Sequence, residues 1–204
     1  MNFIISLCFC LSTFLTLFTE GLELDIDQFY DSIVESSPTS RVAFYGYGDS
    51  PAVGTSVSSA GDFNNDGFDD ILVGAPQYTT GGTVYSLGAV FLVFGKEVES
   101  GVFNASLSNL TAAGFDGIMF IGRESYSYCG KAVAKVGNFN GDEYDDFALS
   151  CTGEGKDFDS GLGVTYIMFG EAAISGSSPK NVTLAGESFS SFNGFRVYGT
   201  EVYG

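Results

Sequence analysis

Residues 62–70, DFNNDGFDD, hold four aspartates, two asparagines and a glycine between two apolar stretches. Carboxylate, amide and backbone carbonyl oxygens are the ligands that Ca²⁺ takes in proteins, about six to eight at a time. Alternate side chains of a tight loop can point inward, so positions 1, 3 and 5 would give side-chain oxygens, position 7 its carbonyl and position 9 a carboxylate. The predicted calcium ligands are Asp62, Asn64, Asp66, the Phe68 carbonyl and Asp70.

Other interpretations of this loop are less favoured. An EF-hand needs a glutamate at position 12, where Val73 stands, and Mg²⁺ demands stricter octahedral geometry and keeps more water. A hairpin turn held only by side-chain to backbone hydrogen bonds is the remaining alternative. Three clustered carboxylates repel one another unless a positive charge lies between them, which favours the metal site, and Gly67 permits the sharp turn.

A second loop with the same spacing, NFNGDEYDD, occupies residues 138–146. Its predicted ligands are Asn138, Asn140, Asp142, the Tyr144 carbonyl and Asp146. Asn138 replaces a carboxylate, and Glu143 stands where the first loop has Gly67. We therefore expect weaker calcium binding at the second loop.

Two cysteines, Cys129 and Cys151, flank this second loop symmetrically about residue 140. Antiparallel pairing of the flanking segments would bring them together, so we expect a disulfide. Two buried thiols are the alternative. Two cysteines alone are too few for a structural zinc site.

The composition excludes several function classes. The chain has no histidine, which removes Ser-His-Asp and Cys-His catalysis and histidine-ligated zinc. Paired carboxylates could serve glycoside hydrolysis, but the two loops account for the dense aspartate clusters. With 8 Lys+Arg against 25 Asp+Glu, the net charge of -17 repels nucleic acid. We expect neither an enzyme nor a nucleic-acid-binding protein in this chain.

The N-terminus predicts secretion. Residues 1–18 are apolar or small and carry no charged side chain, so we expect a signal peptide over residues 1–21, followed by a lead-in over 22–40. An uncleaved membrane anchor is the alternative. Glycosylation sequons begin at Asn104, Asn109 and Asn181. These features predict a protein that is secreted or exposed on the extracellular face of the cell surface.

An internal repeat organises the rest of the chain. Residues 54–75 align without a gap on residues 130–151, 76 positions later, and GAVFLVFG at 88–95 matches GVTYIMFG at 163–170. The sequons at Asn104 and Asn181 also fall at matching places. Four short strands are expected per unit, at 118–121, 132–136, 147–151 and 164–169, with counterparts one repeat earlier. This predicts an all-β fold of four-stranded antiparallel propeller blades, at 41–116 and 117–191, with a third beginning at 192–204.

The acidic loop, followed by ILVGAP at 71–76 and GAVFLVFG at 88–95, resembles the FG-GAP repeat of integrin α-subunit propellers. The resemblance implies that the loops bind calcium as a structural ion and that the blades belong to a seven-bladed ring. The second unit departs from the pattern, with SCTG at 150–153 in place of VGAP at 73–76, which puts that turn in doubt but not the strands. Two blades cannot close a ring, so either further blades follow or several copies assemble.

The resemblance further implies a calcium-binding module for adhesion, with an extracellular protein or glycan as ligand. Tyr45, Tyr47, Tyr126 and Tyr128 lie near glycine-rich connections and could contact that ligand or pack between blades. One alternative is the accessory propeller of a larger secreted hydrolase, similar to glycosylphosphatidylinositol-specific phospholipase D. Another is a purely structural surface repeat protein.

Overall fold

A computed structural model describes residues 41–46, 52–81, 85–97, 102–107, 116–155, 161–172, 180–184 and 193–200. The chain divides into the units Met1–Thr39 and Ser40–Gly204, and the described residues all belong to the second. The predicted signal peptide and lead-in, Tyr47 and the sequon at Asn109 lie outside these residues. Over the described part of the chain, no helix combines the length and the apolar character needed to cross a membrane.

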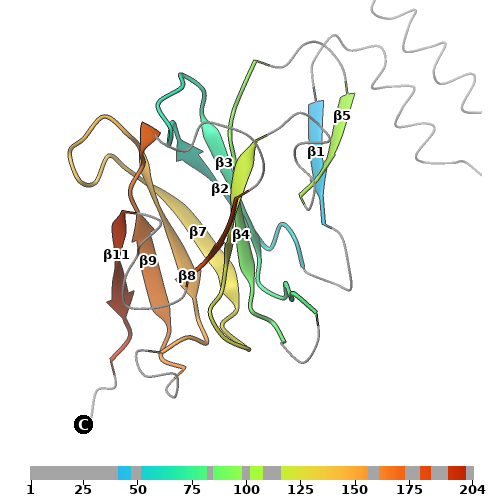
Figure 1. The fold of residues 1–204 in the computed structure, drawn as a ribbon, viewed down its shortest axis with the longest axis vertical. Helices are drawn as coiled ribbons and strands as arrows, with labels where there is room; N and C mark the ends of the chain where they lie inside the picture. The colour runs from blue at the N-terminus through green and yellow to red at the C-terminus, as the bar shows by residue number, and fades with distance from the viewer. Residues whose placement is uncertain are drawn as a thin grey trace, which may run out of the picture. The chain divides into compact units, whose positions relative to one another are not determined.

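The first sheet has five strands in the order β10-β6-β4-β3-β2 (Figure 1). Their bounds are Ser56–Gly61 for β2, Asp70–Ala75 for β3, Ala89–Val93 for β4, Gly117–Ile121 for β6 and Lys180–Thr183 for β10. From β2 to β6 the neighbouring strands run antiparallel, whereas β10 is parallel to β6. Every residue of β4 and β6 is buried, which explains why their sequences are continuous apolar runs rather than alternating ones.

The second sheet has four strands in the order β11-β9-β8-β7, and each neighbouring pair is antiparallel. Its strands are Cys129–Gly137 for β7, Asp146–Cys151 for β8, Val164–Met168 for β9 and Gly194–Tyr198 for β11. Burial alternates along β9, so one face of this sheet packs inside and the other is more accessible. The antiparallel blades predicted from the sequence are therefore present.

The grouping of strands into sheets differs from the expected one. Residues 118–121 were expected to open the second unit, but β6 pairs antiparallel with β4 and completes the first sheet. In the same way β11, which begins the third copy of the repeat, completes the second sheet by pairing with β9. The reason is that a repeat period fixes the spacing of equivalent strands but not the point in the period at which one sheet ends and the next begins.

A third group, the two-stranded sheet of β1 and β5, repeats part of the first sheet. β1 spans Arg41–Tyr45, β5 spans Val102–Ser106, and the two strands are parallel with Ala43 opposite Asn104. The parallel pair β6–β10 places Met119 opposite Asn181 in the same register. β1 is thus the structural counterpart of β6, at the start of the first predicted unit, 41–116.

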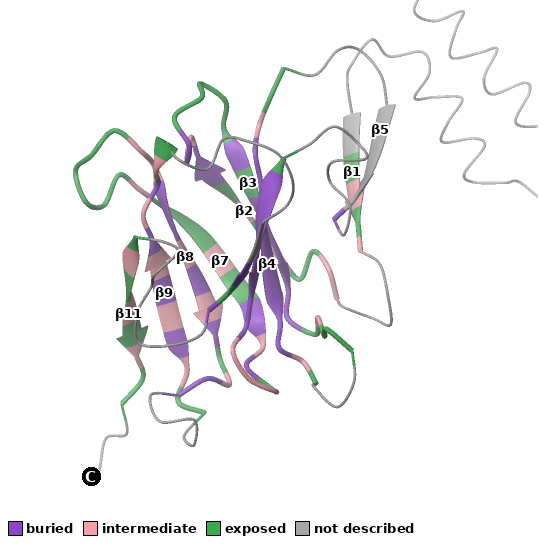
Figure 2. Ribbon diagram, viewed as in Figure 1, coloured by how far each residue is buried: buried purple, intermediate pink, exposed green. Residues whose placement is uncertain are grey.

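The main core lies between the antiparallel part of the first sheet, strands β2, β3, β4 and β6, and the four strands of the second sheet. Leu72, Leu92 and Phe120 from the first sheet pack with Phe147 and Tyr166 from the second, and all five are at most 1% exposed. A second apolar cluster on the opposite face of the first sheet contains Val73, Ala75, Phe91, Met119 and Leu107. Figure 2 shows the resulting buried interior along β3 and β4. This packing fixes the two acidic hairpin loops relative to each other.

Candidate metal-binding loops

Each acidic loop is the hairpin connection between the first two strands of its sheet. Residues 62–69 join β2 to β3, and residues 138–145 join β7 to β8. Both hairpins lie at the upper end of the sheets in Figure 1. The structure thus brings the two predicted sites to the same end of neighbouring blades.

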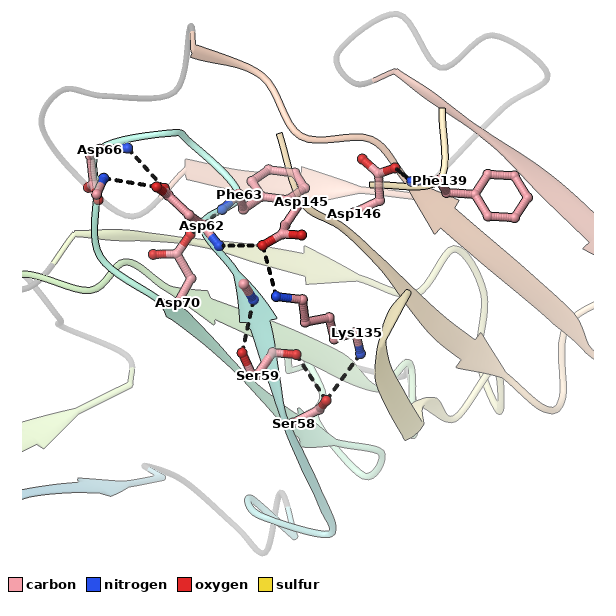
Figure 3. Close-up of polar contacts among 12 residues, drawn as sticks. Ser58, Ser59, Asp62, Phe63, Asp66, Asp70, Lys135, Phe139, Asp145 and Asp146 are labelled. Atoms are coloured by element: carbon pink, nitrogen blue, oxygen red, sulfur yellow. Dashed lines mark hydrogen bonds and ion pairs between the residues drawn. The ribbon is translucent and has the colours of Figure 1, made fainter. Parts of the chain in front are cut away.

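The side chains of the first loop turn inward onto its own backbone (Figure 3). The Asp62 carboxylate accepts hydrogen bonds from the N–H groups of Asp66 and Gly67, both at 2.9 Å. Asn64 accepts from the Asp66 N–H at 3.1 Å and donates its side-chain amide to the Asp66 carboxylate at 2.9 Å. The Asp66 carboxylate also accepts from the Phe68 N–H at 2.9 Å. The predicted side-chain ligands at positions 1, 3 and 5 are therefore gathered in one ring of contacts.

Asp70 closes the first loop from the start of β3. Its side chain is fully buried, and its two oxygens accept hydrogen bonds from the N–H groups of Phe63 at 2.9 Å and Gly95 at 2.8 Å. Burial raises the pKa of Asp70 to about 7, and the negative charges of Asp66 and Asp62 act in the same direction, against the two hydrogen bonds. A cation beside these carboxylates would reverse that electrostatic penalty.

The second loop repeats this arrangement at positions 3, 5, 7 and 9. Asn140 donates to the Asp142 carboxylate at 2.6 Å, and that carboxylate accepts from the Tyr144 N–H at 2.8 Å. Asp146 is fully buried and accepts from the N–H groups of Phe139 at 2.6 Å and Gly170 at 2.9 Å. The aspartate at position 9 thus accepts a hydrogen bond from the glycine that follows the next strand in both blades. The donors are Gly95 after β4 and Gly170 after β9.

Position 1 is where the two loops differ. Asn138 donates its side-chain amide to the Asp142 carbonyl, a contact that the carboxylate of Asp62 could not make, and it accepts from the Gly141 N–H at 2.7 Å. The predicted ligand set of the second loop therefore has one carboxylate fewer than that of the first, as the sequence indicated.

The turn geometry corrects one expectation. The first loop has positive φ at Asn65 (56°) and Gly67 (93°), but the second has it at Gly141 (82°), and Glu143 is not among the described residues with positive φ. Glu143 stands at the Gly67 position without a left-handed conformation, and Gly141, two residues earlier, has positive φ as Asn65 does at the matching position of the first loop. The expected steric penalty at Glu143 is absent, so the predicted weakness of this site rests on Asn138.

The donor set of both loops fits Ca²⁺ in chemistry, with carboxylates, amide oxygens and a carbonyl within nine residues. In the described part of the chain, one group of three acidic or cysteine side chains has its ligand atoms within 4.8 Å of one another: Cys129, Cys151 and Glu154. Its two sulfurs are joined as a disulfide, so that group is not a metal site. The loop carboxylates instead accept hydrogen bonds from backbone N–H groups and lie farther apart than this. A bound ion would replace some of these hydrogen bonds and draw the carboxylates together.

The sequence did not indicate one contact between the two loops. Asp145, the eighth residue of the second loop, accepts a hydrogen bond from the Asp62 N–H at 3.1 Å and donates its own N–H to the Asp62 carbonyl at 3.2 Å. The Asp145 carboxylate also forms a 2.8 Å ion pair with Lys135 of β7, which lowers the pKa of Asp145 and raises that of Lys135. Figure 3 shows Asp145 between the two partners. The paired aspartates at the end of each loop were the sequence signal for this position.

The expected disulfide between Cys129 and Cys151 is present, at paired positions of β7 and β8. A buried polar group that the sequence did not indicate lies beside it. Glu154 is 1% exposed, accepts a hydrogen bond from the Tyr166 hydroxyl at 2.7 Å and pairs with Arg123 at 3.1 Å. This group anchors the connections that precede β7 and follow β8.

The sequons at Asn104 and Asn181 fall in β5 and β10, at equivalent backbone positions. Their glycosylation stays a prediction.

Comparison with known proteins identifies one repeat and several relatives that match part of the chain. Residues 53–93, which include the first loop, match the FG-GAP repeat family. The chain is 31% identical to phosphatidylinositol-glycan-specific phospholipase D of Bos taurus over 133 residues, which is 65% of this chain and 15% of the relative. It is 34% identical to integrin alpha-PS2 of Drosophila melanogaster over 113 residues, 53% of this chain and 7% of the relative. With integrin alpha-5 of Xenopus laevis it shares 28% over 128 residues, 61% of this chain and 11% of the relative.

The chain thus spans a small part of the length of the relatives it matches. The strand order, the hairpin loops and these similarities agree on one assignment: the chain carries an FG-GAP repeat and is homologous, over its blade-forming part, to integrin α subunits and phosphatidylinositol-glycan-specific phospholipases D.

Proposed function

We propose that this chain is part of an extracellular, calcium-binding β-propeller that binds a protein or glycan ligand, with calcium as a structural ion. The observation that carries the proposal is the recurrence of one oxygen-rich loop geometry in two neighbouring blades, each closed by a buried aspartate, Asp70 or Asp146. A turn that needed no ion could be built from fewer carboxylates, without the repulsion among Asp62, Asp66 and Asp70.

Calcium would be held in the first loop by Asp62, Asn64, Asp66, the Phe68 carbonyl and Asp70. In the second loop the corresponding groups are Asn138, Asn140, Asp142, the Tyr144 carbonyl and Asp146. When bound, the ion supplies positive charge that compensates these carboxylates and fixes the hairpin. The role of the protein is to position the donors, which the buried aspartate and the strands on either side of each hairpin do.

Two observations support an extracellular location, and the proposed calcium role is compatible with it. The N-terminal segment has the composition of a signal peptide. The disulfide Cys129–Cys151 suits an oxidising compartment. Extracellular modules bind calcium with dissociation constants of roughly 0.1–1 mM, which suffices outside a cell.

A seven-bladed ring is the arrangement that the integrin-like repeat favours, with the missing blades supplied by a longer chain or by other copies. The intact mass of the native deglycosylated protein separates these. A mass well above the 21.6 kDa of the printed chain would support a longer propeller, whereas a mass at or below it would require assembly of several copies.

A second candidate function is the accessory propeller of a secreted hydrolase. The similarity to the Bos taurus phospholipase covers 65% of this chain, a larger share than the 53% covered by the Drosophila melanogaster integrin. The similarity covers only 15% of that phospholipase, so under this alternative the hydrolase activity would belong to a domain elsewhere in the protein. Finding a hydrolase domain in the native protein would favour this alternative over an adhesion receptor.

Thermal unfolding of the purified protein in EDTA and in calcium tests the calcium proposal. With a dissociation constant of about 0.1 mM, 1 mM Ca²⁺ should stabilise the fold by about 1.4 kcal/mol per site, or about 3–6 °C for a domain of this size. Asp66→Ala should remove most of this gain, and Asp142→Ala should remove less. An equal loss in the two variants would overturn the ranking of the loops, and an identical melting temperature in EDTA and calcium would overturn the metal proposal.

A further inference from the structure

Lys135, in β7 of the second sheet, is the cationic side chain at the junction of the two acidic loops. Its ammonium lies 2.8 Å from Oδ2 of Asp145, and the same oxygen accepts the hydrogen bond from the Asp62 N–H at 3.1 Å. The backbone N–H of Lys135 donates to the Ser58 hydroxyl oxygen of β2 at 3.1 Å. Figure 3 shows these contacts. Lys135 is thus tied directly to β2 and, through Asp145, to the first residue of the first loop.

A glycine makes room for this ion pair. Gly61 ends β2 and has φ of 72°. A Cβ at Gly61 would lie 2.0 Å from Oδ2 of Asp145 and 2.5 Å from Nζ of Lys135. Gly137, at the matching place in the second sheet, has a similar φ of 70°, but the described residues bring no atom within 4 Å of such a Cβ. The backbone at Gly61 therefore leaves the space in which the Asp145 carboxylate and the Lys135 ammonium meet.

The matching residue of the first sheet has a different role. Ser59 lies 76 positions before Lys135, the offset that relates the two repeats. Its hydroxyl oxygen accepts a hydrogen bond from the Gly61 N–H at 2.9 Å, within its own strand. Lys135 instead holds Asp145, the residue that bonds to the first loop. A long cationic side chain at this position thus serves the junction between the blades rather than a local turn.

Carboxylates of the first loop also act on the Lys135 ammonium. The hydrogen bond to Asp145 raises the pKa of Lys135 against the effect of burial, and the negative charges of Asp145, Asp69 and Asp62 add to the rise. Asp62 is a proposed calcium ligand, so the ammonium and a calcium ion would share the attraction of one carboxylate and would repel each other. The Lys135 side chain is 39% exposed, so solvent and salt screen part of this repulsion.

We propose that Lys135 is a positioning residue that sets the calcium affinity of the first loop. Its ammonium acts as a tethered counter-ion. Through Asp145 it holds the loop in place when no calcium is bound, and by repulsion it opposes a calcium ion that binds. Lys135 therefore stabilises the calcium-free protein and lowers the affinity for calcium. This inference rests on the proposed calcium function and adds to it a residue that lies outside the predicted ligand sets.

The test is a calcium titration of the full chain, followed by NMR through the backbone amide signal of Gly67, whose N–H donates to the Asp62 carboxylate. Lys135→Met removes the charge and keeps a long side chain. It should raise the calcium affinity of the first loop about two- to fivefold at low ionic strength, and by less in about 0.5 M NaCl. In EDTA the same variant should melt about 1–3 °C below the parent, because Asp145 loses its partner. A lysine that only supported the fold would, when replaced, lower both the affinity and the melting temperature.

Lys131→Met is the matched control. Lys131 is an exposed lysine of the same strand, and its replacement changes the net charge by the same amount. Because Lys131 lies four positions farther from the loops along β7, Lys131→Met should alter the calcium affinity less than about twofold. Lys135→Arg keeps the positive charge and should bind calcium within about twofold of the parent.

Two results would overturn this inference alone. Equal calcium affinities in Lys135→Met and Lys131→Met would assign the effect to net charge, and a lower affinity in Lys135→Met than in the parent would mean that repulsion by the ammonium does not limit binding. In both cases calcium still binds to the first loop, so the proposed function stands. If the Gly67 signal of the parent does not respond to calcium, the proposed function and this inference fail together.

Discussion

Asp62 and Asp145, the first residue of one acidic loop and the eighth of the next, exchange two hydrogen bonds across the junction between neighbouring sheets. A third contact beside them joins the Glu171 N–H to the Phe63 carbonyl at 3.1 Å. If either loop moved around a bound ion, these hydrogen bonds would shift the other loop as well. The two proposed sites are therefore linked by hydrogen bonds as well as by charge.

The first prediction concerns this coupling. Asp145→Ala removes the acceptor of the Asp62 N–H without altering a proposed ligand, and should weaken calcium binding at the first loop about two- to tenfold. Isothermal titration calorimetry on parent and variant measures it. Asp69→Ala is the control, because Asp69 holds the same place in the first loop and carries the same charge. Equal weakening in both variants would mean that net charge, and not the contact, sets the affinity.

The second prediction concerns the close approach of the sheets. A Cβ at Gly74 in β3 would lie 2.1 Å from the Gly130 carbonyl of β7 and 2.3 Å from the Ser56 hydroxyl oxygen. Gly74→Ala should thus destabilise the fold by about 1–3 kcal/mol, measured by urea unfolding. Ser150 holds the same position in the second sheet, where a side chain is tolerated, and Ser150→Ala should cost less than about 1 kcal/mol. A smaller effect at Gly74 than at Ser150 would contradict the packing argument.

Gly74 and Ser150 illustrate which features can be predicted from the sequence and which depend on tertiary contacts. The hairpins and the gathering of oxygen-bearing side chains within each loop were predictable, because short-range spacing and turn chemistry determine them. The departure of SCTG from VGAP left β8 intact through Cys151, since a strand accepts serine where a glycine is needed only for a neighbouring sheet. The need for Gly74 itself depends on β7, a strand that lies far along the chain.

Contacts between distant residues account for the rest. Asp145 and Asp62 are separated by 83 positions, and nothing in their local spacing links them. Glu154 and Arg123 are single charges in irregular connections, so no periodicity marks them as a buried pair. The assignment of β6 to the first sheet was likewise a matter of tertiary pairing, which the repeat period alone does not fix.

The third prediction concerns the disulfide. Cys129 and Cys151 enclose the second acidic loop with a sequence separation of 22. Replacing both cysteines by serine should cost about 3 kcal/mol of stability, because the unfolded chain regains freedom. Urea unfolding with and without the bridge measures this, and thiol labelling of the denatured, unreduced protein checks the parent. Two reactive thiols per mature chain would refute the bridge.

The fourth prediction concerns pH. Burial raises the pKa of Glu154 above its ordinary 4.5, against the opposing effects of the Tyr166 hydrogen bond and the Arg123 charge, while Glu124 adds to the rise. The folded state therefore holds the Glu154 proton more tightly than the unfolded state does. Its contribution to stability is complete below pH 4.5 and is lost as the pH rises through the higher folded value.

Glu154→Gln isolates that contribution, because glutamine cannot titrate and can still accept the Tyr166 hydrogen bond. The free energy of unfolding of the parent minus that of the variant should fall as the pH rises above 4.5, as urea unfolding at fixed ionic strength would measure. The acidic loops titrate in both proteins, so their effect cancels in the difference. A difference that rises with pH would mean that the ion pair with Arg123 outweighs burial, and that the folded protein favours the charged carboxylate beside the disulfide.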